Sequence, residues 1–522
     1  MARETGRIAR FGGSIRSDVA ARTKPLRSLA MLAALVLLPF LVTVASAPAV
    51  LKRVAGLVVV LGLLVLAGIA SRVLFLVFGV LLAASAVLFQ HVSRHWGGGQ
   101  FDARAEAYFE SPPDEVRQYL AMHVDGLDLV FLEAAVAFVL VLVYACWRMR
   151  PWPAQARIAA ASLLLAGTCG LAFLIPTKQL RAFPPFEPLW RVVVAKQRYD
   201  QLALRAGNLR RRPLAVRKCG LKYDKVVVVL GESAISDRLS IFGYPRPTTP
   251  FALSSRPYAF DTLAPSNQTR YSIAMMLTPA KPGSFGPFFK SHSLVGELRA
   301  CGFHTAWVSN QARRGEWDSF ATSIANEADE QVFLSNWDWN KRKVLDGRLV
   351  DEVVSRGFTE RDRQATFLHL VGSHTDYHER YPAGFGFKDA DTIGEQYDNS
   401  ILYTDYVLSE LYRRFAGRKL LFVYFSDHGQ MVSESRFGSG FLPGYQEEYR
   451  TPLLVWTDDH RAIDAVRAEL GDRRLNLESL DNLLRYLLGM SASPQISTST
   501  RVSVLTPEIV RDYHELDTLA AE

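Results

Sequence analysis

The chain has 522 residues, more than one hydrophobic core organises, so two or more domains are expected. Apolar residues make up 49% of it and gather in residues 1–180, whereas the remainder has the composition of a soluble globular protein. The net charge of +8 comes largely from arginines in 3–27 and 205–217, which flank the apolar segments; this favours contact with membrane lipids and argues against a nucleic-acid partner.

Five apolar segments open the chain, each near the ~20 residues that a membrane-spanning helix needs. They are residues 28–48, 53–70, 72–91, 128–147 and 156–176, of which the second is the shortest. The arginines of the N-terminal tail and of the loop between the last two segments belong on one side, which the positive-inside rule makes cytoplasmic. Five spans then place the rest of the chain in the periplasm of a Gram-negative cell, whereas four would leave it in the cytoplasm.

These boundaries divide the chain into four parts. Their residue ranges are 1–27 for a basic cytoplasmic tail, 28–176 for a transmembrane domain with an outer loop at 92–127, 177–222 for a basic linker along the membrane surface, and 223–522 for a periplasmic catalytic domain. In the outer loop, Ser111 followed by Pro112 predicts the start of a short helix. Cys219 and Cys301 both lie in the outer part, where an oxidising compartment permits a disulfide, and the sequence leaves their pairing open.

Strands and helices alternate in the catalytic part. The apolar runs predict strands at 226–230, 305–309, 366–371, 419–425 and 452–456, with helices near 290–300, 346–357 and 392–416. This order predicts a mostly parallel sheet with helices on both faces. His304, His369, Asp398 and Asp405 are interpreted as structural, and Tyr397 and Tyr403 as packing residues.

Reactive side chains follow three of the predicted strands. Glu232 follows the first, His374 follows 366–371, and Asp427 with His428 follows 419–425. Open α/β sheets bind their ligands at the carboxyl ends of the strands. Oxygen and nitrogen ligands with few thiols suit a catalytic zinc ion.

A nucleophile is expected in the segment 266–278, whose polar start and apolar continuation predict the N-terminus of a helix. Free N–H groups at that end favour a phosphate. Thr269 or Ser272 could therefore act as a metal-activated nucleophile. Arg270, Arg313 or Arg314 could clamp phosphate oxygens, with solvated surface charge as the alternative.

Several stretches carry a family likeness. They are Gly231-Glu-Ser-Ala with 243–250, Thr269-Arg-Tyr-Ser-Ile, His369-Leu-Val-Gly-Ser-His-Thr with Arg380-Tyr-Pro, 397–408 and Ser426-Asp-His-Gly. With these motifs and its five apolar segments, nearly the whole chain resembles the membrane-bound phosphoethanolamine transferases of the alkaline phosphatase superfamily, which modify lipopolysaccharide. The last motif alone would indicate only the superfamily, sulfatases included. The resemblance implies a five-helix transmembrane domain and an α/β periplasmic domain of the alkaline-phosphatase/sulfatase type.

The resemblance also implies roles for individual residues. Zinc would be held by Glu232, Thr269, Asp427 and His428. Thr269 would also be the nucleophile, preferred to Ser272 because the family's reactive threonine stands three residues before a serine–apolar pair. His374 would contact the substrate phosphate and protonate the leaving group. The resemblance implies substrate contacts from Ser111 and Glu115, and Arg270 and Arg314 are expected to contact substrate as candidate phosphate clamps.

Three departures from the family are visible. A family histidine after the Asp-His-Gly motif is replaced by the stretch Gly438-Ser439-Gly440, Gln430 stands in place of a glutamate, and the catalytic part has two cysteines where many members have more. The first zinc site is whole, whereas a second metal site would lack a ligand.

The resemblance therefore implies transfer of phosphoethanolamine from phosphatidylethanolamine, through a phosphothreonine, to a lipopolysaccharide or glycan acceptor. Phosphoglycerol transfer to a periplasmic glycan and hydrolysis by a membrane-anchored sulfatase or phosphodiesterase are the alternatives. We expect a monomeric multi-pass protein of the bacterial inner membrane with its catalytic domain in the periplasm.

Overall fold

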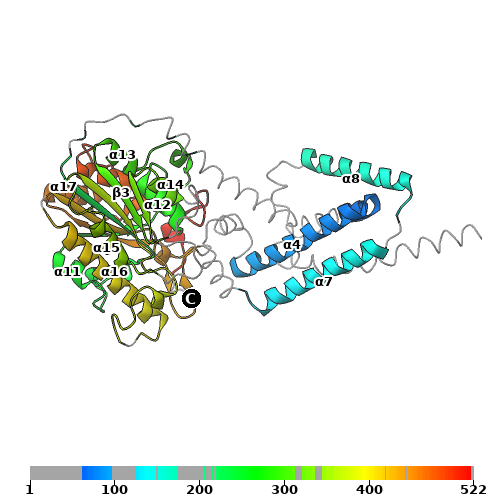
Figure 1. Ribbon diagram of the computed structural model, residues 1–522, viewed down its shortest axis with the longest axis horizontal. Coiled ribbons are helices and arrows are strands. Elements are labelled where there is room, and N and C mark those ends of the chain that lie inside the picture. The colour runs from blue at the N-terminus through cyan, green and yellow to red at the C-terminus, as the bar shows by residue number, and fades with distance from the viewer. Residues whose placement is uncertain are drawn as a thin grey trace, which may run out of the picture. The chain divides into compact units, whose positions relative to one another are not determined.

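The computed structural model describes residues 62–96, 124–148, 151–174, 221–311, 320–334, 344–388, 390–417, 419–440 and 444–518, with Arg205, Leu209, Leu214 and Cys219 as single positions. The chain contains two compact units. One holds the helices α4 (Arg72–Trp96), α7 (Gly126–Arg148) and α8 (Ala154–Leu174), and the other holds all the described strands (Figure 1).

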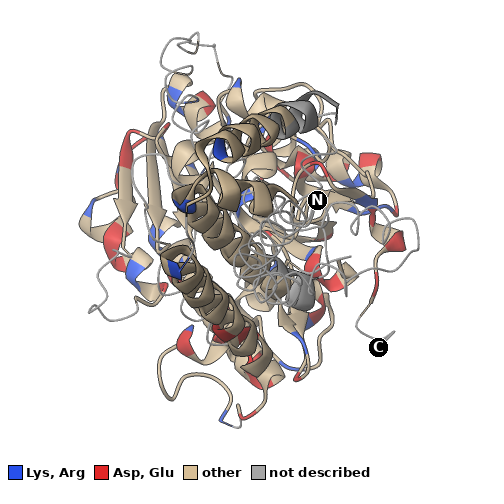
Figure 2. Cartoon of the chain, turned by 90° about the vertical axis from the view of Figure 1, so that its right-hand side faces the viewer, with Lys and Arg blue, Asp and Glu red and all other residues tan. Residues whose placement is uncertain are grey.

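The helical unit presents apolar side chains outward. Helices α4 and α7 pack through Leu82, Phe138 and Leu142, which are buried. Large apolar side chains are nevertheless exposed on all three helices, among them Val73, Val77, Leu81, Leu132, Val136, Leu140, Ile158, Leu163 and Leu165. Figure 2 shows that charged residues are sparse along these long helices. Exposed apolar faces of this kind are what helices in contact with lipid present.

Within the described residues, α7 is long and apolar enough to cross a membrane, and α4 and α8 contain the shorter apolar stretches Arg72–Leu88 and Ala154–Ala166. The expected span 28–48 and the first half of 53–70 lie outside the described residues. The number of five spans therefore stays a prediction.

The second unit is built on an eight-stranded sheet of order β10-β2-β9-β6-β1-β5-β3-β4. The strands are β1 (Lys225–Gly231), β2 (Tyr258–Leu263), β3 (His304–Ser309), β4 (Glu330–Phe333), β5 (Gln364–His369), β6 (Leu420–Ser426), β9 (Arg450–Trp456) and β10 (Leu475–Asn476). Only β9 runs antiparallel to its neighbours β2 and β6 among these strands. The predicted mostly parallel sheet is confirmed.

Strand β1 is central because both of its faces are covered. Val226 and Val228 face one apolar core, and Val227 and Val229 face another. Side chains alternate along a strand, so an uninterrupted apolar run is what a strand buried on both faces requires.

Two groups of helices supply these cores. The first face is covered by α12 (Thr269–Leu277), α13 (Leu294–Ala300), α14 (Phe320–Ala325), α17 (His460–Leu470) and α18 (Leu480–Leu488), and the second by α11 (Pro250–Ser255), α15 (Gly347–Ser355) and α16 (Ile393–Phe415) (Figure 1). Two small hairpins complete the described strands, β7 (Met431–Val432) with β8 (Phe437–Gly438), and β11 (Arg501–Ser503) with β12 (Val510–Asp512).

Helix α16 begins where its sequence predicts. The Thr392 hydroxyl accepts a hydrogen bond from the Glu395 N–H, and the Glu395 carboxylate accepts one from the Thr392 N–H. This capping box satisfies two donors that the first helical turn would otherwise leave unpaired.

Arg205 differs from the expectation for the arginines of 205–217. Its guanidinium is buried in the second unit, where it donates to the Glu327 carboxylate at 2.8 Å and lies over the Phe288 ring. A buried guanidinium is stabilised by such paired donors, so the Arg205 side chain is packed inside the second unit and is not surface charge.

The two outer cysteines are joined. Cys219 and Cys301 form a disulfide with a Cα–Cα distance of 5.6 Å. The bond ties the segment before β1 to the end of α13.

Candidate metal centre

The turn after β1 carries the first site residue. Glu232 is buried, and Ser233 has a φ of 60°. A non-glycine residue in this region costs about 1–3 kcal/mol and persists only where the surroundings hold it. Here the Ser233 N–H donates to Asp427 Oδ1 at 3.0 Å, and its hydroxyl donates to Glu232 Oε1 at 2.7 Å. The strained turn is therefore held by hydrogen bonds to Glu232 and Asp427, two of the residues proposed to bind the metal.

Parallel pairing of β1 and β6 brings the second and third residues alongside. Gly231 is opposite Ser426 in the register, so Glu232 and Asp427 emerge together from adjacent strands. His428 Nε2 lies 3.4 Å from Glu232 Oε1 and 3.3 Å from Asp427 Oδ2. The other ring nitrogen, Nδ1, lies 2.7 Å from the Gly429 carbonyl oxygen. This contact orients the imidazole with Nε2 toward the carboxylates, as in many metal-binding histidines.

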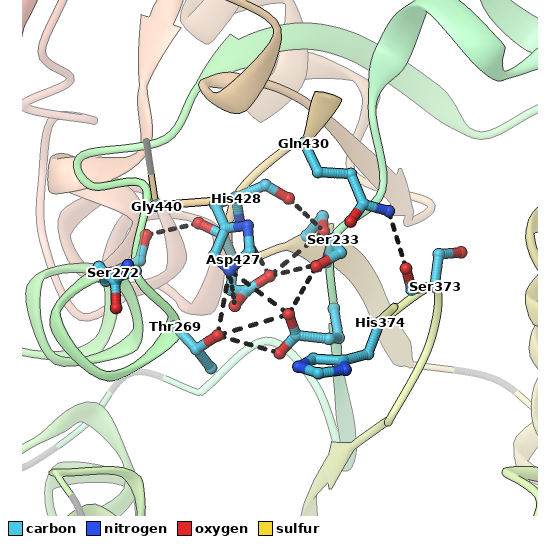
Figure 3. A network of polar contacts seen from close by, with 12 residues as sticks. Ser233, Thr269, Ser272, Ser373, His374, Asp427, His428, Gln430 and Gly440 are labelled. Carbon is cyan, nitrogen blue, oxygen red and sulfur yellow. Dashed lines mark hydrogen bonds and ion pairs between the residues drawn. The ribbon is translucent and has the colours of Figure 1, made fainter. Parts of the chain in front are cut away.

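Thr269 closes the group from a third element. It is the first residue of α12, and its Oγ1 lies 3.1 Å from both Glu232 Oε2 and His428 Nε2 (Figure 3). Ser272 is directed elsewhere, because its buried hydroxyl donates to the Asp427 carbonyl oxygen at 2.5 Å. Of the two candidate hydroxyls, Thr269 is the one that joins the carboxylate and imidazole.

Burial and mutual charge both act on the titration of this group. Burial raises the pKa of Glu232, and the neighbouring Asp427 charge raises it further. Burial lowers the pKa of His428, but the charges of Asp427 and Glu232 outweigh that effect, so its pKa is raised above the usual value. A bound cation would relieve the repulsion between the two carboxylates.

The residues present fit a metal ion. One ligand atom from each of Glu232, Asp427 and His428 lies within 4.8 Å of the others. Asp427 Oδ2 is buried and has no hydrogen-bond partner. A buried carboxylate oxygen without a hydrogen-bond donor is costly, and coordination of a cation would satisfy it. Nitrogen and oxygen donors without sulfur are compatible with catalytic zinc.

His374 comes from the loop after β5. Figure 3 shows its imidazole at the edge of the polar network that contains Thr269 and Asp427, and its positive form would lower the pKa of Glu232. The Gln430 side chain donates to the Ser373 carbonyl oxygen at 2.8 Å and so ties this loop to the segment after β6. The structure thus brings all five residues proposed for metal binding and catalysis to one edge of the sheet.

The predicted substrate contacts are only partly within the described residues. Arg270 is buried, and its guanidinium lies 4.6 Å from the centre of the Tyr271 ring. It is not solvated surface charge. Ser111, Glu115, Arg313 and Arg314 lie outside the described residues.

The stretch that replaces the family histidine has its own contacts. The Gly440 N–H donates to the buried Glu448 carboxylate at 2.5 Å, and the Tyr445 N–H donates to it at 2.9 Å. Within the described residues, one group of three or more residues that could hold a metal is present, at Glu232.

Sequence reasoning missed two residues at the site. The Gln311 side chain donates to Glu232 Oε2 at 3.1 Å, and the Tyr397 hydroxyl donates to the Ser233 carbonyl oxygen at 2.8 Å and accepts from the Ile235 N–H. Tyr397 was expected only to pack, but it also hydrogen-bonds the strained turn. The position of Gln311 two residues after β3, at the carboxyl edge of a parallel strand, is the signal that could have identified it.

The acidic residues of α16 have structural contacts. Asp405 accepts from the Phe251 and Ala252 N–H groups at the start of α11, and Asp398 pairs with Arg238 and Arg246. These contacts agree with the structural interpretation of both residues.

Comparison with known proteins links this site to one family. A family model described as Sulfatase matches residues 224–485. The chain is 33% identical to the phosphoethanolamine transferase OpgE of Escherichia coli over 255 residues, which are 47% of this chain and 48% of OpgE, so the match spans about half of that relative. It is 25% identical to the phosphoethanolamine transferase EptC of Escherichia coli over 464 residues, which are 75% of this chain and 78% of EptC.

Two solved structures share the fold. The periplasmic domain of Escherichia coli EptC, in complex with Zn, has a TM-score of 0.51 and 24% identity, covering 58% of this chain and 97% of that domain. The integral membrane lipooligosaccharide phosphoethanolamine transferase EptA of Neisseria meningitidis has a TM-score of 0.56 and 16% identity, covering 92% of this chain and 99% of EptA. At these identities the likeness shows the fold alone.

Proposed function

Because the chain belongs to the sulfatase family, whose model matches residues 224–485, we propose that it is a zinc-dependent phosphoethanolamine transferase of the bacterial inner membrane. The donor is phosphatidylethanolamine and the acceptor is lipopolysaccharide, at lipid A or the core. The observation that carries the proposal is the Thr269 hydroxyl, 3.1 Å from both Glu232 Oε2 and His428 Nε2 at the start of a helix. The names of OpgE and EptC support phosphoethanolamine as the transferred group.

Glu232, Asp427, His428 and Thr269 would hold one zinc ion. When bound, zinc lowers the pKa of a coordinated hydroxyl and neutralises negative charge near the phosphate. The N-terminus of α12 contributes in the same direction, because its N–H groups and dipole favour an anion.

The first half of the reaction loads the enzyme. Thr269 Oγ1 attacks the donor phosphorus, and its proton passes to the Glu232 carboxylate, to which the hydroxyl donates. The bond from phosphorus to the diacylglycerol oxygen breaks, and His374 protonates that oxygen as it leaves. The products are diacylglycerol and phosphoethanolamine linked to Thr269.

The second half reverses these roles. An acceptor hydroxyl or phosphate attacks the phosphothreonine. His374 takes up the proton that a hydroxyl acceptor releases, and with a phosphate acceptor it takes a proton from water. Glu232 returns the proton to Thr269 as the phosphorus–Oγ1 bond breaks. Because the transfer occurs in two half-reactions, one site binds the donor lipid first and the acceptor lipid second. Arg270 is proposed to neutralise phosphate oxygens in both.

The helical unit would hold the enzyme in the membrane, where its lipid substrates are. Its helices expose apolar side chains, which supports a membrane anchor with several spans. The proposed periplasmic location of the catalytic unit is consistent with the Cys219–Cys301 disulfide, since disulfides persist in oxidising compartments.

The test uses purified full-length protein and phosphatidylethanolamine with a fluorescent head group. We expect one diacylglycerol released per enzyme, and the label retained on the peptide that contains Thr269. Addition of lipopolysaccharide should then discharge the label into the acceptor. Thr269→Ala should abolish loading, whereas full activity of this variant would refute Thr269 as the nucleophile.

Hydrolysis is the second candidate, because the matching family model is that of sulfatases. A hydrolase would release free phosphoethanolamine to water without an acceptor and would turn over repeatedly. Mass spectrometry of lipopolysaccharide from cells with and without the protein would identify the acceptor. Label appearing in a periplasmic glycan would favour a glycan-modifying transferase.

A further inference from the structure

A buried carboxylate outside the proposed metal ligands has an unusual set of partners. Asp346 is the residue before α15, and 4% of it is exposed. An aspartate at this position commonly accepts hydrogen bonds from the N–H groups of its own helix. The Asp346 side chain makes no such capping bond. Asp346 therefore lacks a capping hydrogen bond that would stabilise the helix by about 1 kcal/mol, and its carboxylate has partners at the edge of the sheet instead.

The Asp346 carboxylate joins the ends of two neighbouring strands. It accepts from Asn310 Nδ2, after β3, at 2.8 Å. It also accepts from the N–H groups of Val371 and Gly372, after β5, at 3.0 and 2.8 Å. The segments that leave β3 and β5 are thereby held together at the carboxyl edge of the sheet.

The next residues of both segments contact Glu232. Gln311, next to Asn310, donates to Glu232 Oε2 at 3.1 Å and to the Leu370 carbonyl oxygen at 2.9 Å. On the other segment, the Ser373 N–H donates to the Glu232 carbonyl oxygen at 2.9 Å. Gly372 packs so closely on Glu232 that a Cβ would lie 2.7 Å from that same oxygen. Glu232 is thus held on its side chain by one segment and on its backbone by the other.

We propose that Asp346 is a positioning residue for the metal ligand Glu232, acting through Gln311 and through the Gly372–Ser373 turn. This inference rests on the proposed zinc site. A carboxylate that binds a metal needs its oxygens fixed before the ion arrives, and hydrogen bonds from outside the coordination sphere supply that order. Asp346 contacts neither metal nor substrate, so its effect is on the geometry and affinity of the site.

The experiment measures zinc affinity by chelator competition on detergent-purified full-length protein, together with the ligand-field spectrum of the Co²⁺-substituted protein. Asp346→Asn replaces one acceptor oxygen with a donor that faces backbone N–H groups. We expect it to weaken zinc binding about tenfold to a hundredfold and to shift the Co²⁺ spectrum. Gln311→Ala should do the same in milder form.

Asp351→Asn is the matched control, because Asp351 lies on the exposed side of α15 and pairs only with Arg348 among the ion pairs of the described residues. It should bind zinc as the wild type does. Wild-type affinity and spectrum in Asp346→Asn would overturn the proposal. If Asp346→Asn does not fold, Gln311→Ala decides, and its unchanged affinity would overturn it equally. A wild-type protein that binds no zinc would instead refute the proposed function.

Discussion

At the scale of single residues, the site distinguishes two hydroxyls that lie three positions apart. Thr269 joins Glu232 and His428, whereas the buried Ser272 hydroxyl donates to the backbone at Asp427. One turn of helix places both side chains on the same side of α12, but only its first residue meets the carboxylate and imidazole. The proposed nucleophile is therefore the hydroxyl at the end of the helix, where the free N–H groups lie.

Replacement of Thr269 tests this assignment. Thr269→Ala should lower the loading rate on the order of 10³-fold or more, because the attacking oxygen is lost. Thr269→Ser keeps that oxygen and should retain measurable activity. Ser272→Ala should load at a rate close to that of the wild type. Stopped-time mass spectrometry of the labelled peptide measures all three, and an inactive Ser272→Ala with active Thr269→Ala would reverse the assignment.

His369 supplies a prediction about pH and stability. It is 3% exposed, and burial lowers its pKa to about 4, an effect that the Glu232 charge partly opposes. The unfolded chain, with a histidine pKa of about 6.5, binds the proton first as the pH falls. The contribution of neutral His369 to the free energy of unfolding is therefore complete above about pH 6.5. Between pH 6.5 and pH 4 this free energy falls by roughly 3 kcal/mol.

His369→Gln should flatten this dependence, because glutamine does not titrate. Thermal midpoints of the full-length protein between pH 7 and pH 4 provide the measurement. His378 is exposed, so His378→Gln serves as the control and should keep the wild-type slope. Equal slopes in all three proteins would contradict the role given to His369.

At the scale of elements, the turn after β5 depends on a glycine. Gly372 has a φ of +55°, and a Cβ there would lie 2.7 Å from the Glu232 carbonyl oxygen. Gly357 has a similar φ of +66° but nothing within 4 Å of a Cβ. The two positions share the conformational cost of a side chain and differ in the close approach to Glu232.

Alanine at each position separates these effects. Gly357→Ala should cost about 1 kcal/mol of unfolding free energy and leave zinc affinity unchanged. Gly372→Ala should cost more than this and should also weaken zinc binding, because Glu232 must move. Denaturant unfolding and chelator competition on both variants give the comparison. Equal losses of stability with equal zinc affinity would show that the close approach is unimportant.

The elements that the sequence predicted are those with local signals. The apolar run of β1, the long helix near 392–416 and the residues that follow β5 and β6 were predicted from the sequence, and they led to Glu232, His374, Asp427 and His428 as candidate site residues. Strand β10 has two residues, too few for a pattern, and the reversed direction of β9 depends on its neighbours. Gln311 and Tyr397 contact the Glu232 turn across 79 and 164 positions of sequence. The place of Gln311 after β3 makes it a candidate, whereas no local signal marks Tyr397.

At the scale of the whole molecule, one covalent bond closes a long loop. Cys219 and Cys301 are 82 positions apart. A disulfide that closes a loop of this length lowers the entropy of the unfolded chain and so raises the free energy of unfolding by about 4 kcal/mol. Reduction should lower the thermal midpoint of the catalytic unit accordingly. The double variant Cys219→Ser/Cys301→Ser should have the lower midpoint with or without reductant. A wild-type midpoint that reductant does not change would contradict this prediction.

The order of the strands also sets when the metal site can exist. Strand β1 lies between β5 and β6, whose residues follow it by more than 130 positions, and Ser233 meets Asp427 across 194 positions. Contacts between residues so far apart in the sequence form slowly, because the chain loses the entropy of closing a long loop before the stabilising contacts are made. In the unfolded chain only Asp427 and His428 are neighbours, and two adjacent ligands make a weak zinc site. A metal ion at the proposed site would therefore bind to a sheet that has already closed, and it would stabilise a structure that the chain forms without it.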